Sequence, residues 1–183
     1  MRDEPVANEL RRLAGGPAVV LGWVSGILIL TILSGCAGYS NASLFPTDID
    51  SVCVRTFGNR TFRRGVEYTL SDALVKRIES DTPYRISSDE DRTDSILTGQ
   101  LIAIEESILT LERETGRPLE KEVVLTAVVN WKNLKTARLM MNNKTVTATA
   151  DYSEFLSQDF TYASSVAANN LARKIVQLME NEW

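Results

Sequence analysis

The side chains that most often carry out chemistry are sparse in this 183-residue sequence, and histidine is absent. That absence removes imidazole general bases, histidine-ligated metals and nucleophile pairs that depend on histidine. The carboxylate pair Glu105–Glu106 lies in a strand-like stretch, where adjacent side chains point to opposite faces and cannot share an acid–base site. The acidic run 89–94 lacks the ligand spacing and the glycine of a calcium loop. We therefore expect no enzyme activity, no cofactor and no metal.

Cys36 carries the one recognisable chemical motif, because it closes the run Leu33-Ser34-Gly35-Cys36. This run matches the lipobox of bacterial lipoprotein signals, in which a cysteine thiolate accepts a diacylglycerol and a dedicated peptidase then cuts before that cysteine. We predict that Cys36 is the lipid-attachment site and the first residue of the mature chain. The second cysteine, Cys53, lies in a Val-Cys-Val run and is expected to be a small buried side chain.

Residues 14–33 carry no charge and follow the basic pair Arg11-Arg12, which is the layout of a secretory signal. An apolar run of about 20 residues could also be a transmembrane helix, so a signal anchor with a chance cysteine stays open as an alternative. Ala37, in place of an aspartate after the cysteine, favours sorting to the outer membrane. The predicted organisation is a lipoprotein signal peptide at 1–35, a lipidated tether at 36–50 and one folded domain at 51–183.

Hydrophobic periodicity in the exported part of the chain predicts two helices and one sheet. Two amphipathic helices and a mixed sheet bury each other best as an α+β two-layer sandwich, with both helices on one face of a four- to five-stranded sheet. The first strand–helix–strand unit should pair its strands in parallel. The expected strands are 51–57, 84–87, 95–112 (alternating around Ile102, Ile104 and Ile108), 123–131 and 144–152. The expected helix core residues are Leu70, Leu74, Ile78, Leu171, Ile175 and Leu178.

The sheet face opposite the helices is rich in threonine and asparagine and should meet water or a partner. Basic residues also gather near two hairpins, where their cations could engage phosphate groups. The net charge of −4 offers little attraction to nucleic acid. The candidate partner-face residues are Thr126, Asn130, Thr145, Thr147 and Thr149, and the candidate phosphate-binding residues are Arg113, Arg117, Arg138 and Lys144.

Several short motifs follow one another in a definite order: Cys36…Gly38-Tyr39, Val52-x-Val54-x-x-Phe57-x-Asn59-x-Thr61, Arg64-Gly65-x-Glu67-x-x-Leu70, Leu97-Thr98-Gly99 and Val128-x-Asn130-Trp131. Together they resemble the LptE-type lipopolysaccharide-assembly lipoproteins. The resemblance implies a plug inside an LptD-type outer-membrane β-barrel, which helps to load lipopolysaccharide into the outer leaflet. It also implies that basic residues near a hairpin tip, Arg117 above all, contact lipopolysaccharide. The run Lys135-Thr136-Ala137 departs from the family, because a turn glycine is expected there.

Two other classes compete with this interpretation. A lipoprotein that activates a periplasmic enzyme or builds a secretion channel would carry a similar α/β module, and the partner found in its complex would distinguish it. A membrane-anchored hydrolase is disfavoured by the missing histidine.

Overall fold

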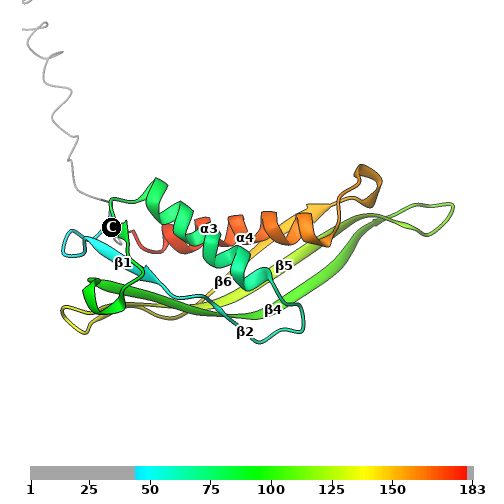
Figure 1. The fold of residues 1–183 in the computed structure, drawn as a ribbon. Helices are drawn as coiled ribbons and strands as arrows, with labels where there is room; N and C mark the ends of the chain where they lie inside the picture. Colours follow the sequence, from blue (N-terminus) through cyan, green and yellow to red (C-terminus); the bar gives the residue numbers. More distant parts are fainter. Residues whose placement is uncertain (1–43, 181–183) are drawn as a thin grey trace, which may run out of the picture. The chain divides into compact units, whose positions relative to one another are not determined.

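The computed structural model describes residues 44–180, which form one mixed sheet with two helices on one of its faces (Figure 1). The predicted α+β sandwich is therefore confirmed. The strand order is β3-β1-β4-β5-β6, and the sheet has six strands because residues 58–59, expected to break the chain, pair with β4. The elements are β1 (Ser51–Val54), β2 (Gly58–Asn59), α3 (Val66–Asp81), β3 (Arg85–Ile86), β4 (Ser95–Leu111), β5 (Pro118–Asn133), β6 (Leu139–Tyr152) and α4 (Phe160–Gln177).

The sheet combines a short parallel part with a long antiparallel part. β1 pairs in parallel with β3 and β4, which confirms the parallel pairing expected for the first strand–helix–strand unit. β4, β5 and β6 form two long hairpins. Gly116, with φ +67°, lies in the first hairpin turn as expected, whereas Ala137 adopts φ +58° in the second. The second hairpin is thus built without the expected glycine, and a side chain in this region of φ costs about 1 kcal/mol.

The starts of the two helices are capped differently. In the first turn of α3, the buried Glu67 carboxylate accepts the N–H of the N-cap residue Gly65 at 2.9 Å and the side-chain amide of Asn59 at 2.6 Å. At the start of α4, the Asp159 carboxylate accepts the N–H of Tyr162 at 2.8 Å, which is a standard N-cap. Both helix starts lie at the same end of the sheet, where β4 and β5 project past them (Figure 1).

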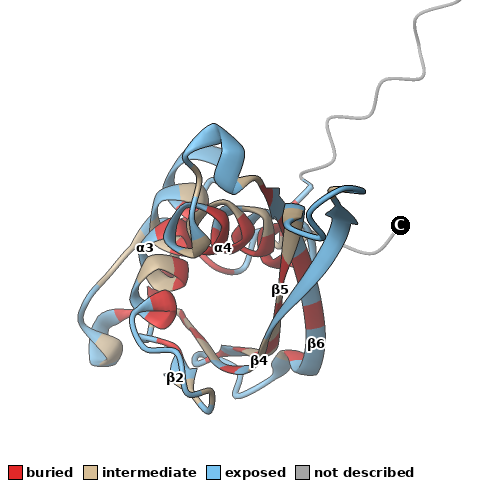
Figure 2. Ribbon diagram, turned by 90° about the vertical axis from the view of Figure 1, so that its right-hand side faces the viewer, coloured by how far each residue is buried: buried red, intermediate tan, exposed pale blue. Residues whose placement is uncertain are grey.

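The helix-facing side of the sheet contains the core (Figure 2). The predicted helix residues Leu70, Leu74, Ile78, Leu171 and Ile175 all have 0% exposure, which confirms them. Leu178 was predicted wrongly. It is 44% exposed because it is the C-cap residue of α4, where regular helical spacing ends, and Met179 is buried in its place.

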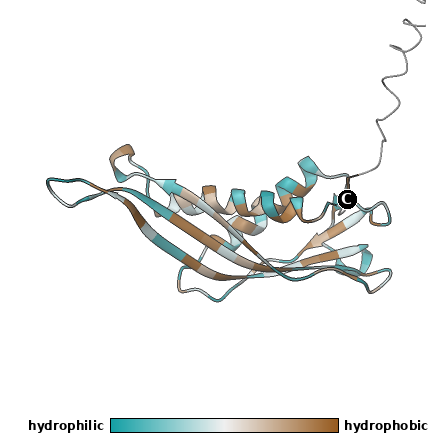
Figure 3. Cartoon of the chain, turned by 180° about the vertical axis from the view of Figure 1, so that it is seen from behind, coloured by the Kyte–Doolittle hydropathy of each residue, from teal (hydrophilic) through white to brown (hydrophobic). Residues whose placement is uncertain are grey.

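The strands alternate between buried and exposed side chains, and hydrophobic and hydrophilic residues follow one another along them (Figure 3). The expected alternation is confirmed for β5 and for the second half of β6. For β4 it is wrong, because Ile102 is 39% and Ile108 is 55% exposed, while Leu97 and Leu101 are fully buried. Ile102 follows buried Leu101 and therefore points to the opposite face, whereas the register shift between Leu101 and Ala103 brings Ile104 to the helix side, opposite Leu125. Ile108 pairs with Lys121 near the β4–β5 turn.

Residues 44–50, the described part of the predicted tether, pack against the domain. Phe45 and Ile49 are buried, and the Phe45 ring contacts the Tyr84 ring edge-on at 5.7 Å. The Asp48 carboxylate accepts the side-chain amide of Asn133 at 2.8 Å. Cys53 is 6% exposed, which confirms it as a small buried side chain. Cys36 and the predicted signal peptide lie outside the described residues.

Candidate partner-binding and lipid-binding surfaces

The sheet face opposite the helices gathers the five predicted partner-face residues. Thr126 and Thr147 lie directly opposite each other on β5 and β6, with their hydroxyl oxygens 3.2 Å apart. Asn130 accepts the backbone N–H of Asn143 at 2.7 Å, which ties the irregular part of β6 to β5. Thr145 and Thr149 continue the exposed row along β6. The fold therefore brings these residues together on one face, with Val128 between Thr126 and Asn130 along β5.

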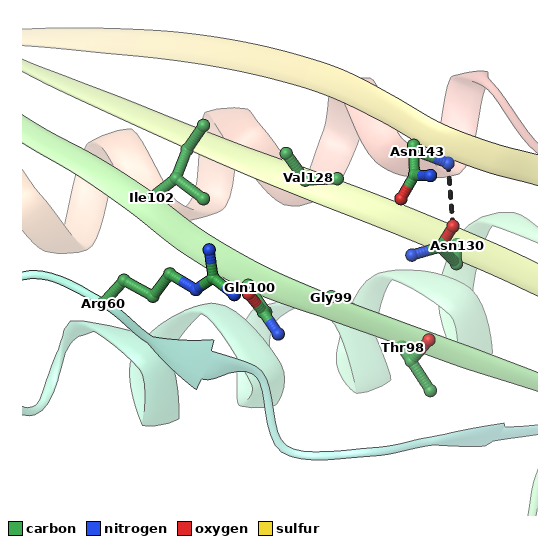
Figure 4. Close-up of a pocket in the computed structure, with 8 residues that line it drawn as sticks. All are labelled: Arg60, Thr98, Gly99, Gln100, Ile102, Val128, Asn130 and Asn143. Carbon is green, nitrogen blue, oxygen red and sulfur yellow. Dashed lines mark hydrogen bonds between the residues drawn. The ribbon is translucent and has the colours of Figure 1, made fainter.

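A shallow depression of about 370 Å³ is set into this face (Figure 4). Gly99 forms its floor with backbone alone, because a Cβ there would come within 2.3 Å of the Phe57 ring on the buried side. Arg60 enters from the loop after β2, and its backbone N–H bonds to the carbonyl of Leu101 at 3.0 Å. The remaining lining residues are Thr98, Gln100, Ile102, Val128, Asn130 and Asn143.

Sequence reasoning missed most of this depression. Thr98 and Gln100 could have been found from their i, i+2 spacing on a strand, which puts them on one face. Arg60 and Asn143 had no such signal, because a loop places the first and a break in the β5–β6 register places the second.

The four predicted phosphate-binding cations fall into two separate pairs. Arg113 and Arg117 lie at the tip of the β4–β5 hairpin, while Arg138 and Lys144 lie near the β5–β6 turn. These two turns flank opposite ends of the 16-residue strand β5, a separation of roughly 50 Å at about 3.4 Å per residue. One headgroup therefore cannot contact both pairs.

The pair Arg138 and Lys144 borders a pocket of about 530 Å³ beside the end of α4. Its lining combines the apolar side chains of Trp131, Met140, Met141, Leu178, Met179 and Pro46 with these two cations and Glu180. Within the described part of the chain, no hydrogen bond or ion pair engages the side chains of Arg138, Lys144, Arg113 or Arg117. The fold does not use these charges, so they are available to an anionic ligand.

The tip that carries Arg113 and Arg117 is closed by its own backbone. Glu112 donates its N–H to the Arg117 carbonyl at 2.8 Å, and Gly116 donates to the Glu112 carbonyl at 2.9 Å. The Glu112 carboxylate also accepts the Thr115 hydroxyl. The tip therefore offers two cations beside two carboxylates, Glu112 and Glu114.

Glu106, expected to be a plain surface residue, instead joins a charged network on the helix side of the sheet. Its carboxylate accepts the Tyr152 hydroxyl at 2.6 Å, pairs with Arg63 at 2.8 Å and lies 3.7 Å from the Lys121 ammonium. The hydrogen bond from Tyr152 lowers the pKa of Glu106, and the two cations lower it further, against the opposing effect of desolvation. A carboxylate held in its charged form stabilises structure and is a poor general acid.

Within residues 44–180, neither helix is long and apolar enough to cross a membrane. No cluster of three or more acidic or cysteine side chains in the same range could hold a metal ion. The fold and surfaces together define an α+β sandwich domain whose sheet is covered by helices on one face only.

This chain belongs to the LptE family of lipopolysaccharide-assembly proteins, whose sequence model matches residues 49–182. The resemblance seen in the sequence motifs is thereby confirmed. No curated protein matches the sequence.

The chain is similar to many solved structures, including the following two. An uncharacterized lipoprotein B from Nitrosomonas europaea has a TM-score of 0.51 and 13% identity, covering 76% of this chain and 87% of that chain. A point variant of the PelC dodecamer from Paraburkholderia phytofirmans has a TM-score of 0.50 and 13% identity, covering 77% of this chain and 96% of that chain. At this identity the likeness shows the fold alone.

Proposed function

We propose that this protein is an outer-membrane lipoprotein, attached through acylated Cys36, that plugs an LptD-type β-barrel and assists lipopolysaccharide insertion into the outer leaflet. It acts by binding, without catalysis or a cofactor. The observation that carries the proposal is the uncovered polar sheet face of a chain in the LptE family. A broad face of threonine and asparagine suits a wet, hydrogen-bonding contact with a barrel lumen.

Co-purification from detergent-solubilised membranes tests the plug role. Thr126→Glu puts a charge at the centre of the uncovered face, where burial against the barrel wall without a partner is costly. We expect this variant to lose the barrel while keeping its circular dichroism spectrum. Thr161→Glu is the matched control, because Thr161 is exposed in the first turn of α4, on the helix layer. Loss of the barrel by both variants, or by neither, would contradict the proposed face.

The lipid-binding role is tested with two matched pairs of cations. Arg138→Ala with Lys144→Ala should weaken binding of purified lipopolysaccharide more than Arg113→Ala with Arg117→Ala, because the first pair lines a pocket in which cations and apolar side chains lie together. The difference should shrink at high salt, which screens exposed charges. Unchanged binding in both double variants would remove the lipid-contact role and leave only the plug role. If no barrel co-purifies with the wild type, the enzyme-activator or secretion-channel interpretation replaces this one.

A further inference from the structure

β6 is the last strand of the sheet, and its outer edge has no neighbouring strand within the described residues. From Lys144 to Tyr152 its pairing with β5 runs without a register shift. Such a long, regular edge presents a row of backbone donors and acceptors that proteins usually cover or blunt.

Two side chains of α4 show which backbone groups of β6 point outward. The Lys174 ammonium donates a hydrogen bond to the carbonyl of Thr147 at 2.7 Å, and the Asn170 side-chain amide donates one to the carbonyl of Thr149 at 3.0 Å. In an antiparallel pair, residues alternate between bonding to the neighbouring strand and pointing away from it. Thr145, Thr147, Thr149 and Asp151 therefore direct both their N–H and their C=O groups to the free edge. The 3.2 Å contact between the Thr126 and Thr147 hydroxyls agrees with this assignment, because side chains are closer in pairs that exchange no backbone bonds.

The side chains of α4 cover the carbonyl groups of this edge but not its N–H groups. Lys174 and Asn170 both donate, so they satisfy carbonyl groups only, and no acceptor side chain in the described part of the chain bonds the outward N–H groups of Thr147 and Thr149. Lys174 is itself exposed, so its side chain can leave the carbonyl without unpacking the core. A ligand that brings acceptors as well as donors would complete the edge.

We propose that the free edge of β6 is a docking site for an extended, acidic segment of the barrel partner, which adds to the sheet as a further strand. Only a polypeptide backbone supplies alternating donors and acceptors at the spacing of a strand. The charges beside the edge specify its character. On β6 from Lys144 to Tyr152 and on α4, the charged residues are the cations Lys144, Arg173 and Lys174 and the carboxylate Asp151, a balance that favours an acidic strand. A second copy of the chain is disfavoured, because antiparallel pairing of two β6 edges would bring the cations of two α4 helices together.

This inference rests on the proposed function, since it describes how that partner is held. It concerns the edge of the sheet, whereas the test with Thr126→Glu concerns the face. The two contacts can therefore fail separately.

Thr147→Pro tests the edge directly. Proline removes the outward N–H and is tolerated on an edge strand whose N–H faces solvent, so the β5–β6 ladder should remain intact. Thr147→Val is the matched control, because it keeps both the N–H and a β-branched side chain. We expect Thr147→Pro to lower recovery of the partner from detergent-solubilised membranes at least tenfold relative to Thr147→Val, which lacks the same hydroxyl of the open face and therefore isolates the loss of the backbone N–H. Circular dichroism of both purified variants checks the fold.

Hydrogen exchange on the wild-type protein provides a second measurement that needs no variant. In the purified complex, the amides of Thr147 and Thr149 should exchange at least tenfold more slowly than in the protein alone. Partner recovery with Thr147→Pro equal to that with Thr147→Val, or absence of this protection, would overturn the inference while leaving the proposed function intact. A protected complex whose mass corresponds to two copies of this chain would also overturn it. Absence of any partner from the wild-type preparation would instead overturn the proposed function, and this inference with it.

Discussion

The two faces of the sheet differ in what holds their side chains in place. On the helix-covered face, apolar residues such as Leu125 and Val129 on β5 are fully buried, and β5 packs against α4. On the open face, the Thr126 and Thr147 hydroxyls hydrogen-bond to each other and to no other described residue. The covered face therefore accounts for stability, because burial of apolar surface is the dominant favourable term in folding. The open face contributes little to folding and is free to be shaped by binding.

Truncation of a core leucine should give the largest loss of unfolding free energy. An unchanged unfolding free energy would contradict the difference between the two faces. Leu74→Ala removes a side chain with 0% exposure, which costs about 2–5 kcal/mol of unfolding free energy. Ile102→Ala is the matched control on the open face and should stay within about 0.5 kcal/mol. Urea denaturation followed by far-UV circular dichroism measures both. Equal losses in the two variants would mean that the open face is part of the core.

Substitution of Glu106 should give the next largest loss of unfolding free energy, because Glu106 is a charged group on the covered side. Glu106→Gln weakens a charge-assisted hydrogen bond and two ion pairs, and should cost about 1.5–3 kcal/mol at pH 7. The pKa of Glu106 is lowered in the folded state, so its contribution is present above the unfolded pKa and is lost as the pH falls through the folded pKa.

Denaturation of wild type and Glu106→Gln across pH measures this contribution. The gap in unfolding free energy should be largest near neutral pH and should close in acid, below the ordinary glutamate pKa of about 4.3. A gap that stays constant across the acid range would show that packing, and not the carboxylate charge, is responsible.

Substitutions in the two turns that bound β5 should have smaller effects on stability, and the two effects should have opposite signs. Gly116→Ala forces a side chain into positive φ and should cost about 1 kcal/mol, whereas Ala137→Gly relieves the same strain. The gain from Ala137→Gly should be less than about 1 kcal/mol, because glycine also loses more backbone entropy on folding. Thermal unfolding should therefore move in opposite directions for the two variants. Movement in the same direction would contradict the assigned turn geometry.

The smallest stability effect is expected on the open face itself. Thr126→Val keeps the β-branched shape and removes one hydroxyl from an exposed pair, so the unfolding free energy should change by less than about 0.5 kcal/mol. Partner recovery should still fall if this face contacts the barrel through hydrogen bonds. A variant that loses stability while keeping its partner would reverse the roles of the two faces.

Local patterns in the sequence were sufficient to predict the fold class, both helices and the paired strands of the first long hairpin. The period of side-chain burial is set by backbone geometry alone, at 3.6 residues in a helix and 2 in a strand. Leu70, Leu74 and the row from Val123 to Trp131 obey that period, so their burial was predictable. The family was also recognisable from local motifs, because their order along the chain is itself sequence information.

Packing between distant segments produced the features that local patterns could not predict. The register shift after Leu101 put Ile104 and Glu106 on the helix side of the sheet, and packing on Tyr84 buried Phe45 within a segment expected to be a tether. Glu106 became a network residue because Arg63, Lys121 and Tyr152 come from three other parts of the chain.

The same reason explains the binding surfaces. The sequence alone shows that Arg138 and Lys144 are basic and lie near a turn. Only the fold separates them from Arg113 and Arg117 along β5 and surrounds them with the apolar end of α4. The one-sided covering of the β6 edge likewise depends on Lys174 and Asn170 reaching the backbone of Thr147 and Thr149 from another element. Periodicity within one element carries no information about which other element lies beside it.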